Sequence, residues 1–206
     1  ANNLYVTGST LSSGVYKGNA VAYRLPYSGE VTTPAASKYT FRVEYEVTVD
    51  ENADNTTALT SFEGKTVTAK VVRNFTNNNY MTLTLPFDMN VAQVNQAFGS
   101  GNATIYTFAS TQKDAEGTLE LHFNTTTSIQ AGHPYILKLN NAVNGFEVDG
   151  VTISTALTDN VQDGITMQPV LDAGGTLNGA TQYWLASDNY LYNAQTYNTA
   201  ILGLRA

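Results

Sequence analysis

The stretch Tyr80-Met81-Thr82-Leu83-Thr84-Leu85-Pro86-Phe87-Asp88 combines strand-forming residues with a proline near its end. Proline has no amide hydrogen to donate to a sheet, so we expect this strand to end before Pro86, where the chain turns into another element. A second stretch, Ala131-Gly132-His133-Pro134-Tyr135-Ile136-Leu137-Lys138-Leu139, has its proline ahead of the apolar run. This order predicts a strand that begins at Tyr135.

Alternation of apolar and polar residues recurs along most of the chain. Between Phe41 and Val49 the odd-numbered residues are apolar and the even-numbered ones are polar, which is typical of a half-buried strand. Turn-forming pairs that contain glycine separate such runs, for example Asn144-Gly145, Asp149-Gly150 and Asp163-Gly164. Further runs cover residues 65–73, 81–85, 104–108, 118–123, 135–139, 151–154, 183–186 and 200–204. The pattern predicts an all-β protein, an antiparallel β-sandwich.

One short helix is predicted at about residues 90–98. Asp88 or Asn90 is suited to cap its start, apolar residues recur every three or four positions, and Gly99 ends the run. Long loops are expected at residues 25–38 and 50–60. A boundary after residue 62 divides the chain into an N-terminal β segment, 1–62, and a β-sandwich module, 63–206. A single domain that contains both is the alternative, because 206 residues suit either arrangement.

The composition indicates an uncharged but polar surface. Charged residues make up 13% of the chain, against about 25% in typical globular domains, and there are 29 Thr and 21 Asn. These residues suit a many-stranded extracellular protein. The net charge of −7 argues against nucleic acid as a partner, and no apolar run is long enough to cross a membrane. The absence of cysteine excludes disulfides and thiolate metal sites. We expect an exported protein whose signal segment has been removed.

Residues with catalytic potential are few. His122 lies on the polar face of a predicted strand with Glu120, which predicts an exposed pair, and His133 precedes a proline, which favours a structural role. No serine lies in a Gly-x-Ser-x-Gly turn. The seventeen acidic residues allow many carboxylate pairs of the kind that glycosidases use, but the sequence singles out none. We therefore predict no enzymatic activity, with a carboxylate-pair glycoside hydrolase as the alternative.

One loop has partial metal-binding spacing. Asp50, Asn52 and Asp54 match positions one, three and five of an oxygen-ligand calcium loop. Asn55 stands where that loop requires glycine, and Ser61 stands where it requires glutamate. A polar hairpin loop is the favoured interpretation and a weak calcium site is the alternative; no other cofactor is expected.

An aromatic cluster near the end of the chain is the candidate ligand site. Its rings are interleaved with Asn and Gln, as on surfaces that stack a sugar and hydrogen-bond its hydroxyls. Packing in a core or at an edge is the favoured interpretation, because Tyr and Trp also prefer half-buried positions, and a ligand platform is the alternative. The residues are Tyr183, Trp184, Tyr190, Tyr192 and Tyr197.

Six short motifs follow one another in order between Gly64 and Ala206: Val71–Phe75, Tyr80–Asp88, Ala97–Gly99, Ile129–Lys138, Tyr183–Ala186 and Leu202–Ala206. This order of motifs resembles a module common in secreted and cell-surface proteins of Bacteroidetes. The module usually has tryptophan at the position of Tyr80 and often cysteine at that of Thr84, and its relatives commonly continue beyond Ala206. The resemblance implies a non-catalytic β-rich module of adhesins, polysaccharide-handling proteins or surface repeat proteins.

Three functions follow as expectations. The first is an extracellular interaction module that binds a glycan or a surface protein in adhesion at a bacterial surface. The second is a structural adhesin or pilus-like subunit or spacer, in which an open sheet edge pairs with a neighbouring strand. The third is a polysaccharide hydrolase or its accessory domain. Exposed aromatic residues would favour the interaction module, and long open sheet edges would favour the structural subunit. Carboxylates that face each other across a cleft would favour the hydrolase.

Overall fold

The computed structural model describes residues 15–17, 42–171, 182–186, 188 and 190–193. The chain divides into two compact units, Ala1–Glu46 and Val47–Ala206. In the first unit, β1 (Val15–Lys17) pairs in parallel with the start of β2 (Arg42–Asp50). The strand expected at Phe41 to Val49 is thereby confirmed. This division, after Glu46, comes earlier in the chain than the predicted boundary after residue 62. The loop after β2 therefore belongs to the second unit.

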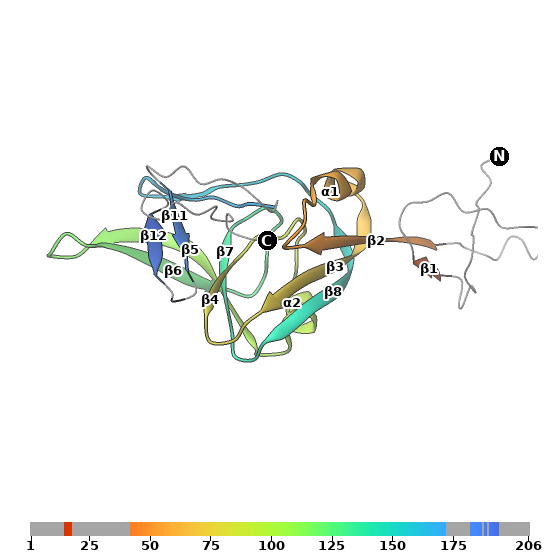
Figure 1. Cartoon of the computed structure of the whole chain (residues 1–206), viewed down its shortest axis with the longest axis horizontal. Helices are drawn as coiled ribbons and strands as arrows, with labels where there is room; N and C mark the ends of the chain where they lie inside the picture. Colours follow the sequence, from red (N-terminus) through yellow and green to blue (C-terminus); the bar gives the residue numbers. More distant parts are fainter. Residues whose placement is uncertain (1–14, 18–41, 172–181, 187, 189, 194–206) are drawn as a thin grey trace, which may run out of the picture. The chain divides into compact units, whose positions relative to one another are not determined.

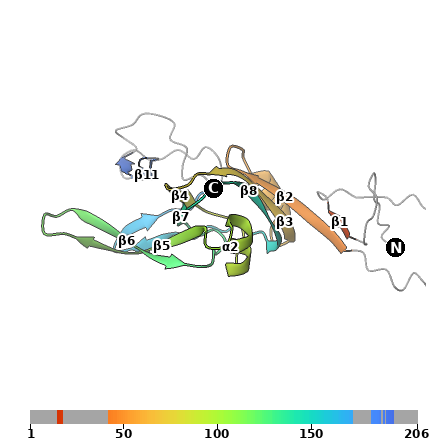
Figure 2. The ribbon, with the colours of Figure 1, turned by 90° about the horizontal axis from the view of Figure 1, so that it is seen from below.

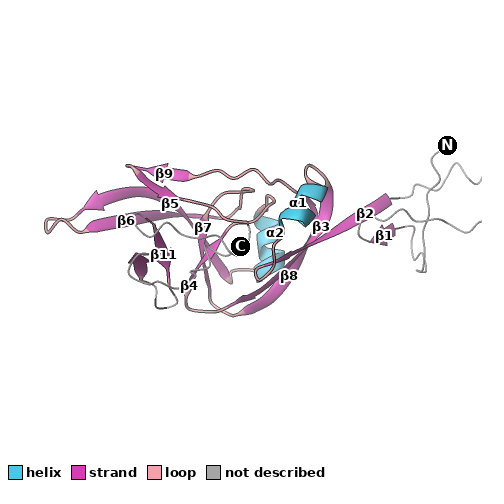
Figure 3. Cartoon of the chain, turned by 45° about the horizontal axis from the view of Figure 1, so that its top comes forward, coloured by secondary structure: helices cyan, strands magenta, loops and turns pink. Residues whose placement is uncertain are grey.

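The described residues are mostly strands, with two short helices, so the all-β class is confirmed (Figures 1 and 3). In one sheet of the second unit, β3 (Thr66–Phe75) lies between the end of β2 and β8 (Val143–Thr152). A second, antiparallel sheet has the order β4-β7-β5-β6. Its strands are β4 (Tyr80–Leu83), β5 (Ala103–Lys113), β6 (Leu119–Thr126) and β7 (Tyr135–Leu139).

The predicted helix is present as α2 (Val91–Phe98). The Asn90 side chain accepts from the amides of Ala92 and Gln93, while the Gln93 side chain accepts from the Asn90 amide, which completes a capping box. The buried face of α2 packs against β8 and β5 (Figure 2). Its Phe98 ring lies 5.4 Å from Phe75 and 5.0 Å from Phe146, so the helix fills the core beside β3 and β8.

A second helix, α1 (Thr56–Phe62), lies where the sequence predicted only a loop, so this part of the prediction is wrong. The helix is short and rich in threonine, which has low helix propensity. Its Leu59 and Phe62 are buried, and the Asp54 carboxylate accepts from the Thr56 amide. Tertiary packing therefore stabilises a turn that local propensity disfavours.

The turns predicted at Asn144-Gly145 and Asp149-Gly150 are also wrong, because β8 runs through both. Gly145 and Gly150 have φ values of +68° and +70°. A side chain on Gly145 would lie 2.6 Å from the Val71 carbonyl oxygen. The glycines thus allow irregular pairing with β3, whose register shifts between Val71 and Asn74.

The two proline stretches lie against each other, and both strand boundaries are confirmed. β4 ends at Leu83 ahead of Pro86, and β7 begins at Tyr135. The backbones of Met89 and Ile129 exchange two hydrogen bonds of 2.9 Å. The Gly132 amide donates to the Leu85 carbonyl at 2.8 Å, and the Ala131 amide donates to the Asp88 carboxylate at 2.7 Å. The two proline stretches therefore form one structural junction, in which Leu85, Met89 and Ile129 are buried.

Two small hairpins complete the second unit. β9 (Asn160–Gln162) and β10 (Ile165–Met167) are joined by the predicted turn at Asp163-Gly164. This hairpin lies beside β5, where Asp163 accepts from the Thr111 amide at 2.9 Å and Asn160 donates to the Phe108 carbonyl at 2.9 Å. β11 (Tyr183–Leu185) pairs with β12 (Leu191–Asn193). The strand predicted at residues 200–204 lies outside the described residues.

Candidate functional site

The β11–β12 hairpin brings together most of the predicted ligand residues. Its register places Trp184 opposite Tyr192 and Leu185 opposite Leu191. Tyr183 begins β11, and Tyr190 directly precedes β12. Tyr197 lies outside the described residues. Four of the five aromatic residues in the predicted cluster therefore lie in or directly beside one hairpin.

Two tyrosines of this hairpin are strongly exposed. Tyr190 has 69% of its surface accessible and Tyr183 has 58%, the two highest values among the large apolar side chains of the described residues. The neighbouring Leu191 is 51% exposed. Tyr183 and Tyr190 are therefore not core residues, and packing at an edge stays open for them, whereas Tyr192 is half-buried.

Asp188 organises the turn between the strands. The Tyr192 hydroxyl donates to one oxygen of its carboxylate at 2.6 Å, and the Tyr190 amide donates to the other at 3.1 Å. The hydrogen bond from the Tyr192 side chain, followed by that from the Tyr190 backbone, lowers the pKa of Asp188. The carboxylate is exposed and stays ionised, so its remaining lone pairs are suited to accept from hydroxyl groups of a ligand. The sequence alone did not single out Asp188.

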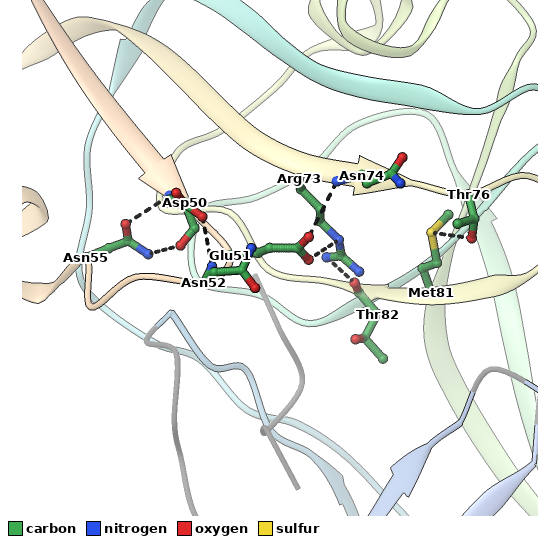
Figure 4. A network of polar contacts seen from close by, with 9 residues as sticks. All are labelled: Asp50, Glu51, Asn52, Asn55, Arg73, Asn74, Thr76, Met81 and Thr82. Atoms are coloured by element: carbon green, nitrogen blue, oxygen red, sulfur yellow. Dashed lines mark hydrogen bonds and ion pairs between the residues drawn. The ribbon is translucent and has the colours of Figure 1, made fainter.

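The Asp50 loop uses its polar side chains to close itself (Figure 4). Asp50 accepts from the Asn52 amide at 2.9 Å, and Asp54 accepts from the Thr56 amide at 2.9 Å. Buried Asn55 accepts from the Asp50 amide at 3.0 Å and donates to the Asp50 carbonyl at 2.9 Å. Bonds from the Thr56 side chain and backbone lower the pKa of Asp54. These contacts account for the spacing of the loop.

Over the described part of the chain, no three His, Cys, Asp or Glu residues are grouped so that they could hold a metal ion. Asp50 and Asp54 each direct one carboxylate oxygen to the backbone. Calcium at Asp50, Asn52 and Asp54 stays a prediction. It would have to use the remaining oxygens of these residues together with backbone carbonyls or water.

Arg73 forms the centre of a buried polar network beside this loop (Figure 4). Its Nε lies 3.3 Å from the Glu51 carboxylate, and its Nη1 donates to the Thr82 carbonyl at 2.8 Å. The side chains of Arg73 and Glu51 are only 8% and 17% exposed. The guanidinium also lies 5.0 Å from the centre of the Phe75 ring. The network joins the Asp50 loop to β3 and β4, which is a structural role that the sequence did not reveal.

The exposed pair predicted for His122 and Glu120 is present, whereas the structural role of His133 stays a prediction. His122 lies 3.5 Å from Glu120, and both side chains are about half exposed, at 47% and 49%. They belong to one strand, β6, so the contact joins residues two apart and does not cross between strands. His133 is half-buried beside the junction of the proline stretches. Neither histidine lies in a catalytic cluster within the described ranges.

Comparisons with protein-family models, curated proteins and solved structures found no match. The resemblance to a Bacteroidetes surface module therefore stays a prediction. None of the helices among the described residues has the length and apolar character needed to cross a membrane.

Proposed function

We propose that this chain is a non-catalytic, extracellular binding module of a bacterial surface, and that it binds a glycan through the β11–β12 hairpin. The exposure of Tyr183 and Tyr190 is the observation that supports this most strongly. A pyranose ring has an apolar face that stacks on a flat aromatic side chain. An exposed tyrosine also has a hydroxyl that hydrogen-bonds to water when no ligand is present.

The polar groups of the hairpin favour a neutral glycan. Asp188 offers carboxylate oxygens beside Tyr190 and Tyr192, which suit donation by sugar hydroxyls. An acidic sugar would instead meet a carboxylate. The last quarter of the sequence has the same sign of charge, with Asp159, Asp163, Asp172 and Asp188 against Arg205.

Affinity electrophoresis tests this proposal. The protein is run through gels that contain neutral glucan, mannan, galactan or xylan, and through a gel with polygalacturonate. We expect retardation in at least one neutral gel. Tyr190→Ala should weaken it at least tenfold, which corresponds to about 1.4 kcal/mol. Val161→Ala on β9 is the matched control, because Val161 is an exposed apolar residue of another hairpin, 55% accessible. It should leave binding unchanged.

Failure to be retarded by any polysaccharide would overturn the proposal, as would equal binding by Tyr190→Ala and the unchanged protein. Incubation with the same polysaccharides tests the hydrolase alternative, because reducing ends accumulate only when glycosidic bonds break. A rise in reducing ends would replace the non-catalytic proposal with an enzymatic one.

The second candidate, a structural subunit that pairs through a sheet edge, is favoured by a different observation. Strand β6 is eight residues long and ends the order of its sheet among the described strands. An open edge of this length is suited to accept a strand from another chain. The two candidates involve different surfaces and do not exclude each other.

A further inference from the structure

Strand β6 lacks the features that usually protect an edge strand. Between Leu119 and Thr126 it has no proline and no lysine, and its residues are exposed or half-buried on both faces. Its pairing with β5 is irregular only at Phe108 and Ser110, where the extra residue lies on β5. β6 itself is continuous. Natural edges are commonly blocked by lysine, proline, bulges or short length.

The other edge strands of the second unit differ from β6 in this respect. β4, at the opposite edge of the same sheet, has four residues and is soon followed by Pro86. β8 contains Gly145 and Gly150 in left-handed backbone conformations. Of the edge strands β4, β6 and β8, β6 is the one that is both long and free of left-handed residues.

The sequence of β6 is complementary to itself in one register. When two copies run antiparallel about an axis at Leu121, Glu120 of each copy lies opposite His122 of the other. Leu119 then lies opposite Phe123, so apolar residues meet on the other face. Cross-strand pairs of this kind stabilise a sheet, and like charges in direct opposition destabilise it.

Neighbouring registers lose this complementarity. An axis at Glu120 places two glutamates opposite each other, and an axis at His122 places two histidines opposite each other. A shift by a single position brings the apolar face of one strand against the polar face of the other. The Glu120–His122 pairs, which can form hydrogen bonds, and the apolar stripe therefore select the same pairing, centred on Leu121.

We propose that two copies of this chain associate through antiparallel pairing of their β6 strands, which gives a continuous sheet of order β4-β7-β5-β6-β6-β5-β7-β4. The interaction is independent of glycan binding at the β11–β12 hairpin. A contact made mainly by one strand from each copy belongs to the small class of interfaces, below about 1,200 Å² in total. The dimer is therefore weak and reversible.

Sedimentation equilibrium of the full chain over a wide concentration range measures the association. In this pairing, His122→Glu places the new carboxylate at position 122 of each copy opposite Glu120 of the other copy. The repulsion occurs twice in the dimer and should weaken dimerisation at least tenfold. Glu120→Lys combined with His122→Glu places a lysine opposite a glutamate in each pair and should return the dissociation constant to within about threefold of the original value. Gln96→Glu, an exposed site on α2, adds the same unit of negative charge away from β6 and should have no effect.

Circular dichroism melting checks that each variant remains folded, which is expected because both β6 side chains are about half exposed. A chain that stays monomeric at every concentration overturns the proposal and leaves the edge to a different partner. The proposal also fails if Gln96→Glu weakens the dimer as much as His122→Glu, or if the double variant does not recover association.

Discussion

Replacement of Gly132 by alanine tests whether the junction of the two proline stretches holds the second unit together. Gly132 has a φ of +68°, and a Cβ atom placed on it would lie 1.9 Å from the carbonyl oxygen of Ala156. Backbone occupies that position, so no side-chain rotation relieves the clash. The segment from Ser154 to Thr158 would have to move away.

The expected loss has two parts. A left-handed conformation costs alanine about 1–2 kcal/mol more than glycine. Movement of the segment breaks the bond from the Thr158 amide to the Gly132 carbonyl, 3.0 Å, and endangers that from the Ser154 amide to the Pro86 carbonyl, 2.7 Å. Each bond contributes about 0.5–1.5 kcal/mol. We expect Gly132→Ala to lower the free energy of unfolding by about 2–5 kcal/mol.

Gly150→Ala separates the clash from the backbone strain. Gly150 has a φ of +70°, but a Cβ there has no atom within 4 Å. The effect of alanine on the unfolded chain is shared by both variants and cancels in their comparison. Urea unfolding followed by circular dichroism should therefore find Gly132→Ala less stable than Gly150→Ala by about 1–3 kcal/mol. Equal stability of the two variants would refute the packing argument.

Two further predictions concern buried polar groups. Arg73→Met should lower the free energy of unfolding by about 3 kcal/mol, because the Glu51 carboxylate loses its cationic partner at a largely buried position. Urea unfolding should show that Glu51→Gln combined with Arg73→Met recovers part of this loss. No recovery would contradict the pairing. Burial, with a smaller contribution from Asp88, raises the pKa of the Tyr135 hydroxyl, although the Gln130 amide bond opposes the shift. The folded state then holds this proton more tightly than the unfolded state, whose tyrosine pKa is about 10, so stability is lost as the pH rises through the folded pKa. Tyr135→Phe should lower the free energy of unfolding by about 1 kcal/mol at neutral pH. It should also reduce the loss of stability at alkaline pH, measured as melting temperatures between about pH 8 and 11. An unchanged loss of stability at alkaline pH would contradict this assignment.

Local signals in the sequence predicted much of the fold. The helix at residues 90–98 was predictable because Asn90 and Gln93 form a capping box within one turn. The strand boundaries at Pro86 and Pro134 were predictable because proline constrains its own neighbours. Helix α1 was missed because its threonines have low helix propensity and its stability depends on the burial of Leu59 and Phe62.

The candidate site was predictable in composition but not in arrangement. The density of aromatic residues pointed to the hairpin that contains Tyr183 and Tyr190. The contact between Asp188 and Tyr192 depends on the turn geometry, which the sequence alone did not specify. The pairing of Glu51 with Arg73 joins a loop to a neighbouring strand and has no sequence spacing that would reveal it.

Tyr135 and Tyr190 show why residue type alone could not separate structure from function. Tyr135 begins the short strand β7 and Tyr190 directly precedes the short strand β12. Yet Tyr135 is buried and its hydroxyl accepts from the Gln130 amide, whereas Tyr190 is 69% exposed. The difference arises from what the rest of the fold places against each ring. The polar atom of Tyr135 serves the junction of the proline stretches, so that residue has a structural role. A ring that the fold leaves accessible, as at Tyr190, has surface to offer a ligand, and this is the physical basis for assigning binding to the hairpin.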